Sequence, residues 1–145
     1  MAKSDEGFSA AEREAMKQRA AELASMKGVK GAAKKAKEYE ACLEAIDALT
    51  GLDRTIAERF HVVVSEEAPH LDPKTWYGFP SYARDGKVVT FVQPASKFDS
   101  RYASVGFNED ASVGDGDMWA TTFAVVEWTD DVESRLRALV RKAAG

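Results

Sequence analysis

The chain has few of the side chains from which catalytic and metal sites are most often built. Among its 145 residues there is one cysteine, Cys42, and there are two histidines, His61 and His70. A single cysteine excludes an internal disulfide and a metal site made of cysteines alone. The chain also lacks a glycine-rich phosphate loop, a nucleophile elbow and a metalloprotease motif. We therefore predict that the protein is not an enzyme.

Long apolar stretches and an excess of basic residues are missing as well. No apolar run reaches the roughly 18 residues that a membrane-spanning helix needs, and no signal peptide is recognisable. The formal net charge is −4, whereas a general nucleic-acid binder needs an excess of positive charge to contact phosphates. We expect a cytoplasmic protein that has neither a membrane nor a nucleic acid as its partner.

The composition is that of an ordinary folded domain. Hydrophobic residues make up 45% of the chain and charged residues 30%, which is typical of globular proteins. A chain of 145 residues can bury one hydrophobic core without disulfides. We expect a single cooperative unit that is a monomer or a homodimer.

A hairpin is the clearest element of the sequence, and it lies within the stretch KTWYGFPSYARDGKVVTFVQP, residues 74–94. Asp85-Gly86 readily supplies the positive φ angles of a tight turn, and aromatic and β-branched residues flank it. The expected arms are Trp76–Tyr82 and Val88–Gln93. Pro80 cannot donate to a ladder, so it predicts that the first arm is an edge strand or carries a bulge.

Two further strands are expected after the hairpin, at Arg101–Phe107 and within Met118–Trp128. The second contains TTFAVVEW, which is apolar on both faces by alternation and is typical of a central strand covered on both sides. Alternation within the first hairpin arm places Trp76 and Tyr82 on one face of the sheet and Tyr77 and Phe79 on the other.

Helices are expected at both ends of the chain. The capping box Ser9-x-x-Glu12 predicts a helix that runs to about Met26 and has few apolar residues. Lys27–Lys37 contains two glycines and five lysines and predicts a hinge. Residues 1–36 are therefore expected to form a helical, partly flexible arm, and residues 37–145 a domain. Its expected fold class is α+β, with amino-terminal helices, an antiparallel sheet of four to six strands and a carboxy-terminal helix.

A longer pattern surrounds the hairpin and ends in a strand that leads into Val132–Lys142. Its earlier residues are Pro69, Leu71, Lys74, the run Trp76-Tyr77-Gly78-Phe79-Pro80, Tyr82, Asp85-Gly86-Lys87, Phe91 and Lys97. This pattern resembles the YdhG-like domain family. The resemblance covers roughly residues 38–143 and leaves the amino-terminal arm unmatched. It implies a frataxin-like fold and, because the family includes a bacterial iron chaperone, weak iron binding, although most of the family is of unknown function.

The first functional hypothesis is a carrier that binds iron weakly through helix carboxylates. Glu40, Glu44 and Asp47 recur at helical spacing on one face, and Asp53 and Glu58 lie on the next expected helix. Hard cations such as Fe(III) accept oxygen ligands in open sites, so iron is the ligand that this pattern predicts. The alternative interpretation of the same carboxylates is a solvated helix face.

The second hypothesis is a binder of a small anionic ligand or a protein partner on one face of the sheet. Its expected contacts are Trp76, Tyr82, Lys97, Arg101 and Tyr102, which combine aromatic rings with positive charge. The alternative interpretation is that most of these rings belong to the core and that the cations border a turn.

The cysteine and the histidines are expected to have structural roles. Cys42 lies beside an apolar stripe and is predicted to be a core residue. His61 follows Glu58 by one helical turn, but two ligands are too few for a metal site, so His61 is expected to be a partly exposed helix residue.

Overall fold

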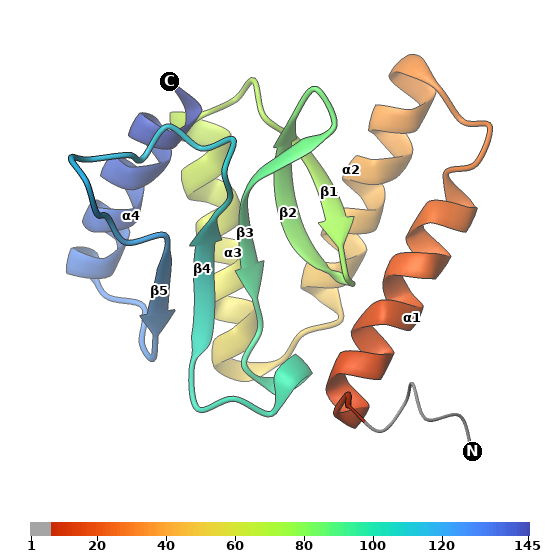
Figure 1. The fold of residues 1–145 in the computed structure, drawn as a ribbon, viewed down its shortest axis with the longest axis horizontal. Helices are drawn as coiled ribbons and strands as arrows, with labels where there is room; N and C mark the ends of the chain where they lie inside the picture. The colour runs from red at the N-terminus through yellow and green to blue at the C-terminus, as the bar shows by residue number, and fades with distance from the viewer. Residues whose placement is uncertain (1–6) are drawn as a thin grey trace.

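The computed structural model describes residues 7–145 and shows helices and a five-stranded sheet (Figure 1). Every pair of neighbouring strands is antiparallel, and the strands follow one another across the sheet in chain order. This confirms the α+β class, with three helices before the sheet and one after it. The elements are α1 (Ala10–Ser25), α2 (Gly31–Asp47), α3 (Gly51–Glu67), β1 (Asp72–Trp76), β2 (Phe79–Arg84), β3 (Lys87–Gln93), the 3-10 turn η2 (Ser96–Phe98), β4 (Ala103–Phe107), β5 (Thr122–Val125) and α4 (Asp130–Ala144).

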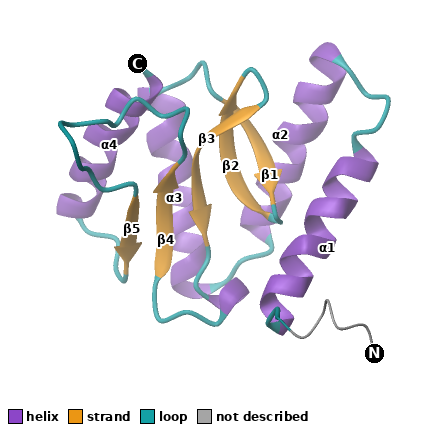
Figure 2. Cartoon of the chain, in the orientation of Figure 1, coloured by secondary structure: helices purple, strands orange, loops and turns teal. Residues whose placement is uncertain are grey.

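The helices are distributed unevenly around the sheet (Figure 2). α3 and α4 contact each other and β3, and α2 contacts β1 and β2, so these three helices cover one face. α1 lies beside the β1 end of the sheet and makes its main contacts with β1 and η2. No helix among residues 7–145 is long and apolar enough to cross a membrane.

The hydrophobic core lies between the sheet and α2, α3 and α4. Phe60 and Val63 of α3 are fully buried there against strand residues such as Val92, and Val140 of α4 completes the layer. Cys42 also belongs to this core, as the sequence predicted. No residue of α1 takes part, so the core forms without that helix.

The turn of the expected hairpin is confirmed, but a second two-residue turn, which the sequence did not predict, lies before it in the chain. Asp85 and Gly86 have φ angles of 52° and 80° and join β2 to β3. Tyr77 and Gly78 have φ angles of 54° and 84° and form a second two-residue turn, which joins β1 to β2. The predicted arm Trp76–Tyr82 therefore contains a turn, because Trp76 ends one strand and Phe79 begins the next.

This additional turn corrects the predicted faces. Trp76 pairs with Phe79, and the two rings lie 5.8 Å apart on the face away from the core. Tyr82 points to the opposite face, where its ring contacts that of Phe60 at 5.9 Å. Trp76 and Tyr82 are therefore on different faces, because the alternation of side chains does not continue through a two-residue turn.

Two predictions about the positions of strands in the sheet were wrong. β2, which contains Pro80, is not an edge strand but lies between β1 and β3, whereas the predicted bulge has a counterpart in the register shift of the β2–β3 ladder between Tyr82 and Ala83. The pairing of β2 with β3 begins at Ser81, so the missing N–H of Pro80 interrupts no bond of that ladder. β5 is an edge strand rather than a central one, and its residues Thr122 and Ala124 are exposed. Its apolar side chains face the core on one side only.

The expected hinge is shorter than the sequence indicated. α2 begins at Gly31, so most of the lysine-rich run is helical and the break between helices is confined to residues 26–30. The predicted boundary between residues 36 and 37 falls inside α2, because Lys34, Lys35 and Lys37 extend the helix instead of interrupting it. Residues 1–6 of the predicted arm lie outside the described part of the chain.

Gly106 provides a test of the aromatic cluster on the face away from the core. A methyl group at this position would overlap the ring of Phe91, which packs against Trp76 and Phe79. We expect Gly106→Ala to lower the free energy of unfolding by about 1–3 kcal/mol, measured by urea denaturation. In the control Gly114→Ala, the new methyl would lie 3.6 Å from Trp119, and the change should stay within about 0.5 kcal/mol. Equal effects of the two variants would contradict this packing.

Candidate functional site

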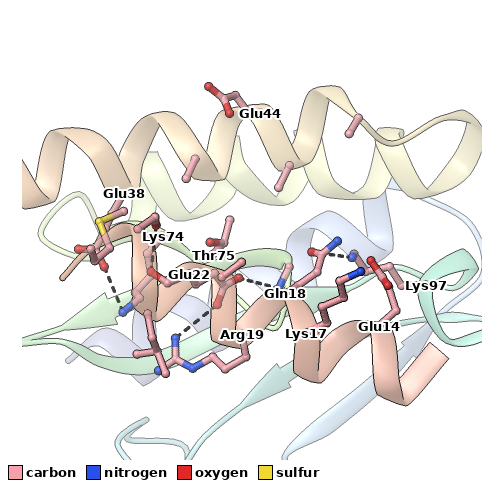
Figure 3. A pocket seen from close by; sticks show the side chains of 18 of the residues that line it. Glu14, Lys17, Gln18, Arg19, Glu22, Glu38, Glu44, Lys74, Thr75 and Lys97 are labelled. Atoms are coloured by element: carbon pink, nitrogen blue, oxygen red, sulfur yellow. Dashed lines mark hydrogen bonds and ion pairs between the residues drawn. The ribbon is translucent and has the colours of Figure 1, made fainter. Parts of the chain in front are cut away.

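A cavity of about 1040 Å³ lies between α1, α2 and the β1–β2 turn (Figure 3). Its apolar wall comes from small side chains of α2, Ala41 and Ala45, together with Leu23 of α1. Its polar lining contains both signs of charge, which come from α1, α2, β1 and η2. The basic lining residues are Lys17, Arg19, Lys34, Lys74 and Lys97, and the acidic ones are Glu14, Glu22, Glu38 and Glu44.

Lys97 is a partly buried cation of this cavity that has no carboxylate within ion-pair distance in the described part of the chain. Its Nζ donates a hydrogen bond of 3.0 Å to the neutral side chain of Gln18 and has no ion-pair partner among residues 7–145. Burial lowers the pKa of Lys97, and the negative charges of Glu14 and Glu22 oppose this shift. Lys74 differs, because its Nζ lies 3.2 Å from Glu38 in a pair of which each side chain is 14% exposed.

The Tyr77–Gly78 turn presents two backbone N–H groups to the carboxylate of Glu22. The N–H of Tyr77 donates to Glu22 Oε1 at 3.1 Å, and the N–H of Gly78 donates to Oε2 at 2.7 Å. Arg19 lies 3.4 Å from the same carboxylate (Figure 3). Glu22 thus attaches α1 to the turn through both of its oxygen atoms.

The sequence did not identify Glu22 or this turn as a site. The Tyr-Gly pair was a usable signal, because glycine at the second position of a two-residue turn supplies the positive φ angle. Glu22 offered no comparable signal, because its bonding partners lie 55 and 56 residues further along the chain.

The five carboxylates of the iron hypothesis do not meet at one point. Asp47 and Glu58 flank Arg54, at 3.4 and 3.6 Å from its guanidinium nitrogens. Asp53 accepts hydrogen bonds from the N–H groups of residues 95 and 96, at 2.8 and 3.0 Å. Glu40 and Glu44 are exposed on α2. Among residues 7–145 there is no group of three or more Asp, Glu, His or Cys side chains that could hold a metal ion.

The electrostatics of Asp53 agree with a structural role. Burial alone would raise the pKa of its carboxyl, but hydrogen bonds from Ser96 and Ala95 outweigh this effect and lower the pKa. The ionised carboxylate therefore fixes the start of η2 against α3. Its two oxygen atoms are already occupied by these backbone donors.

The five residues of the anion hypothesis are also separated. Lys97 lines the cavity described above, and Trp76 is half-buried in the aromatic cluster near the turn. Arg101 lies over the exposed ring of Tyr102, 5.5 Å from its centroid, and both line a smaller cavity of about 280 Å³ near Asp53. Tyr82 is fully buried in the core and is unavailable to a ligand on the other face.

Tyr82 instead belongs to a buried polar group. Its hydroxyl lies 2.9 Å from His61 Nδ1 and beside the thiol of Cys42, and Tyr39 covers the imidazole edge-on. Burial raises the pKa of Cys42 to about 11, so this thiol stays protonated at neutral pH. Burial also lowers the pKa of His61, which is half-buried as the sequence predicted. The arrangement binds α2, α3 and β2 together.

Comparisons of this chain with models of known protein families, with curated proteins and with solved structures found no match.

The histidine in the buried group should make the stability of the protein depend on pH. The unfolded chain binds a proton at His61 near pH 6.5, about the ordinary value, whereas the folded protein binds it only at lower pH. The free energy of unfolding should therefore be highest above that pH and fall as the pH is lowered from 7.5 to 5.5. His61→Gln, which does not titrate, should show a smaller fall in urea denaturation series. Identical pH dependence of both proteins would contradict this assignment.

Proposed function

We propose that the protein is a non-enzymatic binding module that holds a small anionic molecule in the cavity between α1, α2 and β1. The observation that carries the proposal is Lys97, a partly buried cation whose hydrogen-bond partner in the described chain, Gln18, is neutral. Glu14 and Glu22 act on Lys97 through space without forming an ion pair, so an anion at hydrogen-bond distance gains an interaction that full exposure to water would weaken.

The lining of the cavity supports an amphiphilic anion. Small apolar side chains of α2 form one wall, and Lys17 and Lys34, which also have no ion-pair partner in the described chain, lie on the rim. The volume of about 1040 Å³ lies at the upper end of the range for small-molecule sites. A carboxylate or phosphate group joined to a short apolar body fits this combination.

The family resemblance and the iron role are supported to different degrees. The order of helices, antiparallel sheet and helix agrees with the α+β order that the resemblance to the YdhG-like domain family implies, and the frataxin-like fold stays a hypothesis. The weak iron-carrier role stays a hypothesis, and the separation of its carboxylates favours the anion instead. The absence of a catalytic motif in the sequence supports a binding role over an enzymatic one.

A thermal-shift experiment tests the anion proposal. Octanoate or octyl phosphate, at roughly ten times its Kd, should raise the Tm by about 2–4 °C, whereas neutral octanamide should not. Lys97→Gln should weaken the binding about tenfold. The control is Lys87→Gln, which removes an exposed lysine from the start of β3 and should leave binding unchanged. Equal shifts with octanamide, or an equal response of both variants, would contradict the proposal.

Anaerobic calorimetry with Fe(II) separates the two hypotheses. Because the five helix carboxylates do not gather, we expect no saturable heat from the wild-type protein. A saturable heat that is lost when Glu40, Glu44 and Asp47 are replaced by alanine would instead establish the iron role.

A further inference from the structure

We infer that the Tyr77–Gly78 turn is an anion seat, that the Glu22 carboxylate fills it as an internal ligand, and that α1 is a lid which an external carboxylate or phosphate displaces. The seat consists of the two backbone N–H groups of this turn. The displacement of the lid rests on the proposed function, since the incoming group belongs to the ligand of the same cavity.

The two N–H groups of the turn are arranged so that they bind both oxygen atoms of one carboxylate. Each oxygen of Glu22 accepts from a different N–H, at 3.1 and 2.7 Å, and the two donors are consecutive in the chain. Successive N–H groups in a left-handed turn form a concave site for anions. The carboxylate or phosphate of a separate molecule presents the same pair of oxygen atoms, so it can replace Glu22 without any change in the turn.

The lysine of the proposed cavity lies beside this seat. A side chain starting at Gly78 would begin 2.7 Å from Lys97 Nζ and would overlap the Gln18 amide. Glycine at this position therefore leaves room for both groups as well as supplying the positive φ angle. When α1 leaves, Lys97 loses its bond to Gln18 and becomes available to the same anion that occupies the seat.

The attachment of α1 is weak enough for such a displacement. Ala15 is the buried residue of this helix, and no α1 side chain enters the hydrophobic core. Met16 and Leu23, two of its larger apolar side chains, are 40% and 58% exposed. The link to α2 spans residues 26–30 and contains Gly28, whose φ is 79°. The polar contacts of Glu22 and Gln18 are the connections to the seat and to Lys97 that an anion has to replace, and Lys37 Nζ donates a further hydrogen bond of 2.8 Å from α2 to the Ser25 carbonyl.

A second two-residue turn of the same chain, Asp85–Gly86, can be compared with the seat. The Asp85–Gly86 turn has nearly the same φ angles as the Tyr77–Gly78 turn. Gly86 also lines the cavity, but no atom lies within 4 Å of where its side chain would begin. The two turns differ in their partners, because the Glu22 carboxylate and Lys97 Nζ lie against only the first. An anion that recognised the bare turn conformation alone would bind both.

Amide NMR during an acetate titration tests the seat directly. In Glu22→Gln the seat loses its internal carboxylate, so the Tyr77 and Gly78 amide signals should shift saturably, with an apparent affinity about tenfold higher than in the wild type. Glu44→Gln is the matched control, because Glu44 is an exposed glutamate that lines the same cavity from α2 and contacts neither the turn nor Lys97. It should behave like the wild type, and the Gly86 amide should not titrate in any variant.

Two results would overturn the inference. One is an equal acetate response of Glu22→Gln, Glu44→Gln and the wild type at the Tyr77 and Gly78 amides, and the other is an equal response of the Gly86 amide. The inference is separable from the proposed function. Octanoate that fails to stabilise the wild type, while acetate saturates the seat in Glu22→Gln, removes the cavity function and leaves the seat. Octanoate binding that depends on Lys97 but is unchanged in Glu22→Gln removes the lid.

Discussion

The hydrogen bonds between the Glu22 carboxylate and the Tyr77–Gly78 turn hold the amino-terminal helix in place. A two-residue turn leaves its own N–H groups outside the strand ladder, so they need another acceptor. Glu22 supplies that acceptor from α1, which contributes little apolar surface to the rest of the protein. Without ligand, this contact holds α1 against one side of the cavity, whose other sides come from α2, β1 and η2.

The remainder of the protein is stabilised differently. α2, α3 and α4 bury their apolar side chains against one face of the sheet, and ion pairs link α3 to α4 on the outside. Arg137 is the centre of that network, with its guanidinium within 3.1 Å of Glu66, Glu67 and Glu133. The body of the protein therefore has a core that is independent of α1, whereas one side of the cavity is formed by α1. This division lets one part move while the other stays folded.

The features that the sequence predicted well are those set by nearby residues. Asp85-Gly86 specifies its turn through local backbone preference, and Ser9 with Glu12 specifies the start of α1 through a capping box that the structure confirms. The features that it missed depend on distant contacts. Tyr77-Gly78 was taken as part of a strand, which reversed the predicted face of Trp76, and the exposed position of β5 is decided by the order of strands.

The candidate site also combines a residue that the sequence identified with partners that depend on distant contacts. Lys97 was identified because it is a cation in the basic part of the chain, but its neighbours Gln18 and Glu22 belong to a helix about 75 residues earlier.

The central claim is that α1 is a lid held over an anion seat. The most direct test is the distance between spin labels at Ala20→Cys and Lys87→Cys, both exposed positions, in a protein whose own cysteine is buried. The account predicts one narrow distance distribution without ligand and a broader, longer one with saturating octanoate, whereas an unchanged distribution under confirmed binding would contradict it.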